Sequence, residues 1–129
     1  MRRLIIVALI LAIASPLVAG DRIKVPEFVL AVSLVGFSVA DTAITIYGTS
    51  RLGMTETNRL MRPFLEGRHY AALWAVQGAA CAGIIWACHG LIHHDEKPVR
   101  IVGYALLVAV NLGRAYCVVS NLRTHARAR

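Results

Sequence analysis

Three long apolar segments separated by charged loops constrain this chain most strongly. They run roughly from Glu27 to Ser50, from His69 to Ile92 and from Val99 to Leu122. A helix needs about 20 apolar residues, at a rise of about 1.5 Å per residue, to cross the hydrocarbon core of a bilayer. Soluble core helices are seldom this long without a polar face, and no alternation of period two favours a β-barrel. The sequence therefore predicts an all-α integral membrane bundle with three core transmembrane helices.

The composition supports a membrane protein and argues against nucleic-acid binding. Of the 129 residues, 57% are apolar and the mean hydropathy is +0.61, which is too apolar for an ordinary soluble domain of this length. The net charge of +7 comes from arginines scattered between apolar segments, and no nucleic-acid-binding motif accompanies them. Three cysteines fall inside apolar segments, so we expect small buried residues instead of disulfides or zinc ligands. They are Cys81, Cys88 and Cys117.

The first 20 residues, MRRLIIVALILAIASPLVAG, allow two interpretations. A basic start, an apolar stretch and the small residues of SPLVAG are typical of a signal sequence. The apolar part, from Leu4 to Ala19, is long for a signal sequence and short for a span, so residues 1–20 are either a signal sequence or a fourth transmembrane helix. The rest divides into a membrane domain, 27–122, with a loop at 51–68, and a basic tail, 123–129.

Positive charge is uneven across the expected membrane. The loop 51–68 carries four arginines and the tail 123–129 carries three, whereas the two connections on the other side share four Lys and Arg residues. Lys and Arg accumulate in the cytoplasmic loops of membrane proteins. We therefore expect a multi-pass protein with this loop and the C-terminus in the cytoplasm.

Each apolar segment places a polar side chain at a similar depth. Asp41, Gln77 and Arg114 lie nine or ten residues from the arginine at the cytoplasmic end of their segments, about 13 to 15 Å deep. An unpaired ion there costs about 2.5 to 3.5 kcal/mol, so such residues usually face the bundle and find partners. We expect Asp41 and Arg114 to pair, with Gln77 and Asn111 as hydrogen-bonding neighbours. Thr45 lies one turn after Asp41 on the same helix face.

The Asp41 and Arg114 pair has three interpretations at this stage. It locks the register of the helices, as buried polar groups do in some assemblies. Alternatively it forms a functional site, which is the usual role of ions within a membrane. In the third interpretation Arg114 extends to the lipid headgroups without a protein partner.

Small residues recur every four positions in the second and third segments and form a ridge on one face of each helix. Such ridges let helix backbones approach closely. We expect them to pack helices together around the polar residues, within the chain, in a homo-oligomer or against another membrane protein. The ridges comprise Ala71, Ala75, Ala79, Gly83 and Ala87 in one segment, and Ala105, Ala109, Gly113 and Cys117 in the other.

The loop RLGMTETNRLMRPFLEGRHY contains a second candidate site, formed by Gly53, Glu56 and Asn58. Thr57 or Asn58 is suited to cap a short helix that gathers apolar residues on one face. The pattern fits an interfacial helix on the cytoplasmic leaflet and equally a solvated connector. Helix capping explains Glu56 and Asn58 as well as ligand binding does.

Nine residues of the first segment and the loop form an array of fixed type and spacing: Asp41, Thr45, Gly48, Leu52, Gly53, Glu56, Asn58, Leu60 and Met61. The array resembles an uncharacterised family of small prokaryotic integral membrane proteins, the domain of unknown function 5658. In that family a helix with Asp and Thr leads into Gly, a Glu-x-Asn-Pro-like turn and two further helices. The resemblance covers roughly residues 33–121, with Arg59 where the family commonly has Pro and Gln77 near an expected Lys. It implies a three-helix core in a prokaryotic inner membrane, without an assigned activity.

The stretch CHGLIHHDEK places His89 and His93 one helical turn apart, beside further polar residues. That spacing is compatible with a transition metal. The stretch lacks the glutamate of HExxH, and histidines beside acids are common in connecting loops, so we expect no metal. The neighbouring polar residues are His94, Asp95 and Glu96.

The sequence favours a non-catalytic membrane component whose helices pack against a partner or a second copy within the lipid bilayer. The alternative is a small transporter or proton-linked protein that uses the intramembrane polar residues. No cofactor fingerprint or nucleophile and base pair is apparent, so we expect neither catalytic residues nor a cofactor. The candidate polar site comprises Asp41, Thr45, Gln77, Asn111 and Arg114.

Overall fold

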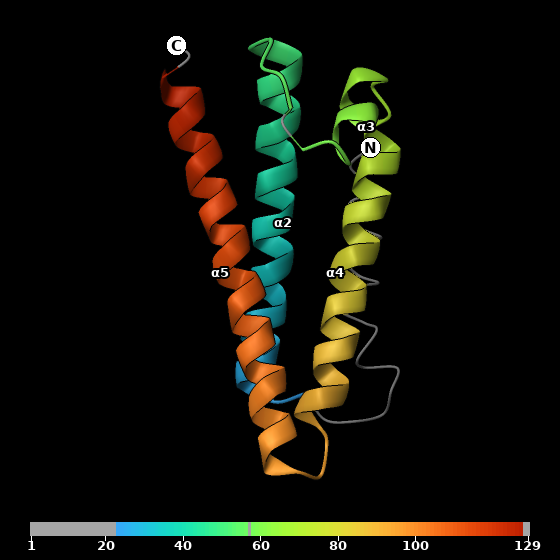
Figure 1. The fold of residues 1–129 in the computed structure, drawn as a ribbon, viewed down its shortest axis with the longest axis vertical. Helices are drawn as coiled ribbons and strands as arrows, with labels where there is room; N and C mark the ends of the chain where they lie inside the picture. The colour runs from blue at the N-terminus through green and yellow to red at the C-terminus, as the bar shows by residue number, and fades with distance from the viewer. Residues whose placement is uncertain (1–22, 57, 128–129) are drawn as a thin grey trace.

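The computed structural model describes residues 23–56 and 58–127, and every regular element in these ranges is an α-helix. The helices α2, α4 and α5 are long and lie side by side, whereas α3 is short and lies at one end (Figure 1). Their bounds are α2 Val25–Arg51, α3 Arg62–Glu66, α4 Tyr70–Ile92 and α5 Lys97–Arg127. The three long helices are long and apolar enough to cross a membrane. The prediction of an all-α chain with three such helices is confirmed.

The predicted helix ends are close to the observed ones except at the end of α5. This helix continues to Arg127, five residues beyond the predicted end at Leu122, so residues 123–127 of the predicted tail are helical. The alternatives for residues 1–20 lie outside the described residues. α2 ends where the amides of Leu52 and Met54 both donate to the carbonyl of Gly48, each at 3.1 Å, and Gly53 follows with φ of +64°. A glycine suits this position because positive φ strains residues that carry a Cβ.

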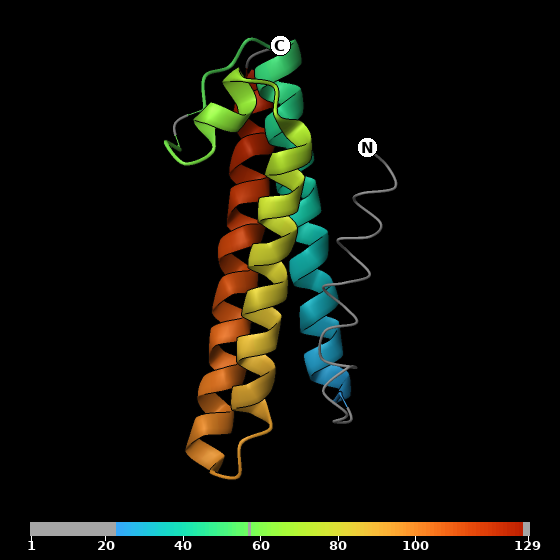
Figure 2. The ribbon, with the colours of Figure 1, turned by 90° about the vertical axis from the view of Figure 1, so that its right-hand side faces the viewer.

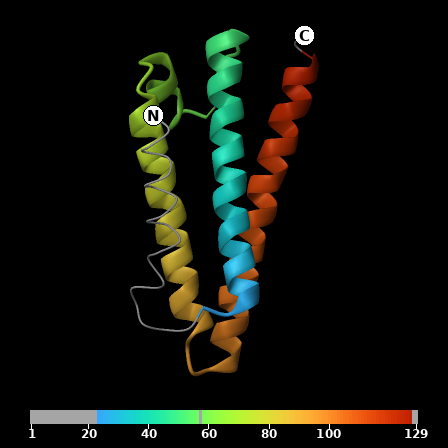
Figure 3. The same ribbon diagram turned by 180° about the vertical axis from the view of Figure 1, so that it is seen from behind.

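The chain direction alternates along the bundle. α2 and α5 run in the same direction, and α4 runs antiparallel to both (Figures 1 and 3). We call the end that holds α3 and the loop 51–68 the loop end, and the opposite end, where α4 connects directly to α5, the hairpin end. Seen from the side, α3 projects from the loop end beside α4 (Figure 2).

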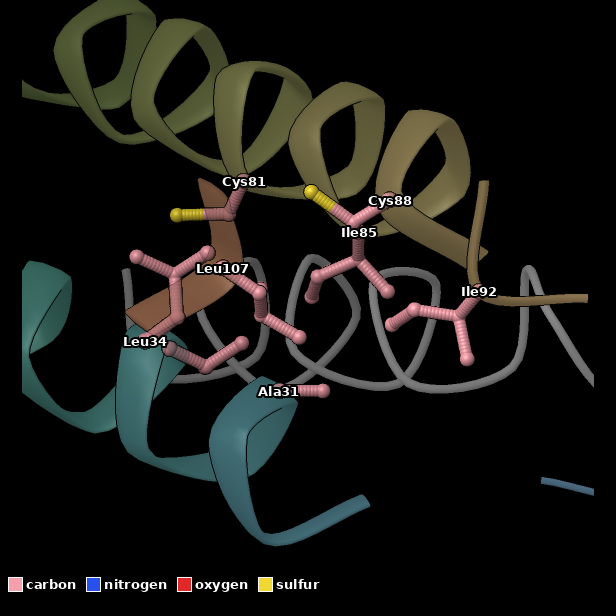
Figure 4. Close-up of a cluster of buried hydrophobic side chains, with 8 residues drawn as sticks. Ala31, Leu34, Cys81, Ile85, Cys88, Ile92 and Leu107 are labelled. Atoms are coloured by element: carbon pink, nitrogen blue, oxygen red, sulfur yellow. The ribbon is translucent and has the colours of Figure 1, made fainter. Parts of the chain in front are cut away.

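An apolar core fills the half of the bundle near the hairpin end. Ile85 and Ile92 of α4 point towards Leu34 of α2, and Leu107 of α5 lies close to them (Figure 4). These four side chains are at most 2% exposed. Aliphatic side chains packed this closely gain many van der Waals contacts, each small and together large. This cluster therefore closes the hairpin half of the bundle.

Two of the cysteines belong to that core, as predicted, and the third does not. Cys81 and Cys88 are buried, and the Cys81 thiol donates to the hydroxyl of Ser38 at 3.1 Å. Cys117 of α5 is exposed.

The small-residue ridges also face away from the core. Every residue of the α4 ridge (Ala71, Ala75, Ala79, Gly83 and Ala87) is exposed, as is every residue of the α5 ridge (Ala105, Ala109, Gly113 and Cys117). A Cβ placed on Gly83 or Gly113 meets nothing within 4 Å. The prediction that these ridges join the helices of the chain to one another is therefore wrong. Large residues on the opposite faces of α4 and α5 fill the core instead.

Close approach inside the chain depends on Gly103, near the start of α5. A Cβ at Gly103 would lie 2.9 Å from the backbone nitrogen of Ile92 and 2.9 Å from the Cβ of Leu91. Backbone atoms cannot move aside as a flexible side chain does, so this glycine permits the tight packing of α5 against the end of α4.

Gly103 and Gly113 provide a matched pair for testing this packing. We expect Gly103→Ala to lower the free energy of unfolding by about 1 to 3 kcal/mol, because the added methyl overpacks the helix contact. Gly113→Ala should leave it unchanged or raise it by up to about 1 kcal/mol, since alanine favours a helix and the site is open. Thermal unfolding in mild detergent, followed by circular dichroism, measures both. Equal effects of the two substitutions would contradict the role assigned to Gly103.

Candidate functional site

The guanidinium group of Arg114 joins all three long helices. Its Nη1 lies 3.4 Å from Oδ2 of Asp41 on α2, and its Nη2 donates to Oε1 of Gln77 on α4 at 3.0 Å. The predicted pair and its glutamine neighbour are therefore present. The planar fork of arginine allows two partners to be held at once. Arg114 has protein partners, so the interpretation in which it reaches the headgroups without one is wrong.

A second donor, Asn121, completes the contacts of Asp41. Its Nδ2 donates to Oδ1 of Asp41 at 2.8 Å and lies 3.4 Å from Oγ1 of Thr45. Asn121 follows Arg114 by seven residues, which is two helical turns, so the two side chains share a face of α5. That spacing is visible in the sequence. Asn121 was not predicted because it lies at the expected edge of the membrane, where polar side chains are usually solvated and need no protein partner.

Asn111 does not join these residues. Its amide nitrogen donates to the carbonyl of Leu30 at 3.0 Å and to that of Leu107 at 2.8 Å. It precedes Arg114 by three residues and sits within the apolar half, where its side chain ties α5 to the backbone of α2. The prediction that Asn111 accompanies Asp41 and Arg114 is wrong, because Asn111 lies nearly one helical turn nearer the hairpin end, where its side chain bonds to backbone carbonyls of the apolar half.

The loop residues form a connected turn before α3. Oε1 of Glu56 accepts a hydrogen bond from the amide of Asn58 at 2.8 Å, and Oδ1 of Asn58 accepts one from the amide of Leu60 at 3.0 Å. Nε of Arg62 donates to the carbonyl of Glu56 at 3.1 Å. Side-chain bonds of this kind to amides two residues ahead stabilise turns. Glu56 and Asn58 therefore shape the loop ahead of α3, whose own N-cap, Met61, makes no side-chain capping bond. Thr57 lies outside the described residues.

A cavity of about 350 Å³ at the loop end brings the two candidate groups together. Its volume lies within the range of about 300 to 1,000 Å³ that is usual for small-molecule sites. Asp41 and Arg114 reach it from the helices, and Glu56 and Asn58 reach it from the loop. The remaining lining residues are Thr42, Thr45, Met61, Leu73, Gln77, Tyr116, Cys117, Ser120 and Asn121. Gly53 positions the loop by ending α2, and Asn111 does not line the cavity.

The charges around the cavity do not balance. Two carboxylates, Asp41 and Glu56, line it together with one guanidinium, Arg114. The side chains of Asp41 and Arg114 are 15% and 22% exposed, so they are largely withdrawn from solvent while still lining the cavity. Charges attract more strongly where water is partly excluded. The lining of the cavity thus contains one carboxylate more than it contains guanidinium groups.

Comparison with models of known protein families, with curated protein sequences and with solved structures found no match. The resemblance to the domain of unknown function 5658 stays a prediction. Five of the residues that carry it, Asp41, Thr45, Glu56, Asn58 and Met61, line the cavity described above. The geometry of these side chains is thus the basis for a functional proposal.

A double-mutant cycle measures how strongly the pair contributes to the fold. We expect Arg114→Gln to lower the free energy of unfolding more than Asp41→Asn, because it leaves a partly buried carboxylate without its cation. The double variant should recover part of that loss, with a coupling energy of about 0.5 to 3 kcal/mol between the two positions. Thermal unfolding of the four proteins in mild detergent supplies the values. Arg123→Gln, an exposed arginine on the same helix, is the control.

Additive effects of the two substitutions would show that the contact contributes nothing to stability. The pair would then hold the charges of the cavity in position without strengthening the fold.

Proposed function

We propose that this chain is a multi-pass integral membrane protein that binds a small cationic solute in the cavity beside Asp41, and acts as a small transporter or proton-linked protein. The observation that carries the proposal is the unequal charge of the cavity, where the carboxylates of Asp41 and Glu56 accompany the single guanidinium of Arg114.

Exposed apolar side chains support the placement in a membrane. Trp86 of α4 is 65% exposed, and Ile101 and Leu112 of α5 are 58% and 67% exposed. Soluble monomers rarely expose contiguous apolar surface over so much of their length, whereas a lipid bilayer accommodates it. The length and hydropathy of α2, α4 and α5 agree with this placement.

Arginines at the loop end support an orientation. Arg51, Arg59, Arg62 and Arg68 lie in the loop and its flanks, and Arg123 and Arg127 lie in the last turns of α5, which end beside it (Figure 1). Positive residues favour the cytoplasmic side. We therefore assign the loop end, the C-terminus and the cavity to the cytoplasmic side of a membrane, which the family resemblance implies to be a prokaryotic inner membrane.

The chemistry of the lining suits an ammonium or guanidinium group. The carboxylates supply charge-assisted acceptors, which form the stronger class of hydrogen bond. Amides of Gln77, Asn58 and Asn121 offer neutral donors and acceptors for the rest of a solute. A proton is a cation that the same site could take up. Protonation of Asp41 would weaken its contact with Arg114. Solute binding and proton binding would therefore act on the same helix contact.

Passage across a membrane would require a change of structure. The cavity lies at the loop end, and the core of Leu34, Ile85 and Leu107 closes the bundle beyond it. Transporters expose a central site to the two sides in turn. The structure corresponds in this scheme to a state with access from the loop end.

Binding is tested through the unfolding temperature of the purified protein in mild detergent. We expect primary amines, diamines and guanidinium compounds to raise it, and carboxylic acids of matched size to leave it unchanged, because a ligand of the folded state stabilises that state. Glu56→Gln should weaken binding of the best amine about tenfold, which corresponds to about 1.4 kcal/mol. Glu66→Gln, an exposed acid of α3 that does not line the cavity, should bind like the wild type.

Three results would contradict the proposal. The first is stabilisation by acids in preference to amines, and the second is unchanged amine binding by Glu56→Gln. The third concerns transport, measured as flux of the bound amine and of protons into liposomes. Equal flux with the wild type and with Asp41→Asn would exclude the transporter interpretation, and only solute binding would remain.

The exposed α4 ridge favours a second candidate, a non-catalytic component that packs against another copy. All five ridge residues are exposed, and the space beyond Gly83 is open. Ridges of small residues allow close helix contact within membranes, where the hydrophobic effect offers no drive for association. The ridge is therefore available to a second membrane helix.

The oligomeric state of the protein tests this candidate. We expect Gly83→Leu to shift the protein from dimer or higher oligomer to monomer, because the larger side chain separates the helices. Gly36→Leu, at an equally open glycine of α2, should leave the oligomer intact. Mass photometry in detergent and single-molecule photobleaching in liposomes report the state. A wild type that is monomeric in both would argue against self-association.

A further inference from the structure

Three metal-ligand side chains meet at the hairpin end, far from the cavity. Oε1 of Glu27 lies 2.5 Å from Nδ1 of His89, and Oε2 of Glu27 lies 3.0 Å from Nε2 of His93. One donor atom from each of the three residues lies within 4.8 Å of the other two. The two imidazole rings face each other, with centroids 4.3 Å apart and planes inclined by 41°.

The fold brings these residues together from helix ends that are distant in the sequence. Glu27 occupies the first turn of α2, directly after Pro26. His89 lies in the last turn of α4, and His93 caps that helix through its amide, which donates to the carbonyl of His89 at 3.0 Å. Residues four apart share a helix face, and the antiparallel course of α2 and α4 places Glu27 beside that face.

Burial separates this cluster from an ordinary surface ion pair. The side chains of Glu27 and His89 are 3% and 5% exposed, and that of His93 is 18% exposed. A carboxylate this deeply buried is costly unless charge and hydrogen bonds compensate it. Two imidazole nitrogens therefore converge on a negative group that solvent reaches only past His93.

We propose that Glu27, His89 and His93 bind a divalent transition-metal ion, with zinc as the best-matched class. Two histidines and one carboxylate form a donor set typical of zinc sites that keep one position open. The ion would lie about 2.0 to 2.2 Å from a Glu27 oxygen, Nδ1 of His89 and Nε2 of His93, and its binding would displace the protons that these groups now share. The partial exposure of His93 leaves a side from which a solvent molecule completes the coordination.

The connecting loop does not supply the site. His94, Asp95 and Glu96 are exposed, and the amide of Glu96 donates to Nδ1 of His94 at 3.2 Å. From the sequence we expected no metal at these histidines. The third ligand, Glu27, lies more than sixty residues before His89, so the spacing of the histidines alone does not reveal it. A bound ion would join the start of α2 to the end of α4.

The site is separate from the proposed solute cavity. Glu27 precedes Asp41 by fourteen residues on α2, which is about 21 Å along the helix axis. Metal binding can therefore be tested without the function proposed for the cavity. Either proposal can fail while the other stands.

The test uses the full-length protein in mild detergent, purified without a polyhistidine tag and freed of metal with a chelator. Zinc affinity is measured by competition with a chromophoric chelator, and cobalt(II) absorption in the visible range reports four-coordinate geometry. We expect the wild type to hold one ion per chain, and Glu27→Gln and His93→Asn to lose at least about 100-fold in affinity, beyond the usual effect of residues that merely orient ligands. His94→Asn is the matched control and should bind like the wild type.

A second measurement needs no variant and remains decisive if the variants fold poorly. Diethylpyrocarbonate modifies accessible imidazoles, and mass spectrometry identifies the modified residue. We expect zinc to protect His93 while His94 is modified equally with and without zinc. Absence of zinc binding by the wild type, an equal loss in His94→Asn and His93→Asn, or modification of His93 that zinc does not change would overturn the proposal. Glu27, His89 and His93 would then form a buried hydrogen-bonded cluster that holds no metal.

Discussion

The contacts of Arg114 set the arrangement on which the loop half of the bundle depends. In the proposed membrane placement, the guanidinium of Arg114 needs partners, because each unpaired ion in a bilayer costs about 2.5 to 3.5 kcal/mol or more. Arg114 finds one on each neighbouring helix, Asp41 on α2 and Gln77 on α4. Rotating or sliding any one helix would break a contact that lipid cannot replace. The arginine thereby fixes both the rotation and the height of three helices that would otherwise pack through interchangeable apolar faces.

Division of the bundle into two halves explains where chemistry is possible. Leu34, Ile85 and Leu107 fill the hairpin half with side chains that offer no hydrogen bonds. Polar groups are found on either side of that core, in the cavity at the loop end and in the cluster of Glu27 with two histidines at the hairpin end. The apolar core thus lies between the two polar sites.

Sequence reasoning succeeded where one physical quantity decided the outcome. Position along the predicted helices sufficed to pair Asp41 with Arg114 and to bring Gln77 to them. Depth did not decide the remaining cases: Asn111 lies nearly one turn further into the core and bonds to backbone carbonyls there, and the small-residue ridges face outward. A single sequence does not fix which face of an apolar helix meets its neighbours, because α4 is almost equally apolar all round.

Residues near the helix ends were missed for a different reason. Asn121 and Glu27 lie where polar side chains are ordinarily solvated, so neither stands out from its surroundings in the sequence. Their importance arises from partners on other helices, Asp41 in one case and His89 in the other. Glu27 lies in the first turn of α2 and His89 in the last turn of the antiparallel α4, so the two residues lie at the same height in the bundle.

The distance in sequence between Asp41 and Arg114 has a consequence for biogenesis. The two residues are 73 positions apart. At about 5 to 20 residues per second, a ribosome needs roughly 4 to 15 s to synthesise the intervening chain. In the proposed membrane placement, α2 would carry its carboxylate during that interval without Arg114 or Asn121. The contacts that join the three long helices at the loop end can therefore form only after α5 has been synthesised.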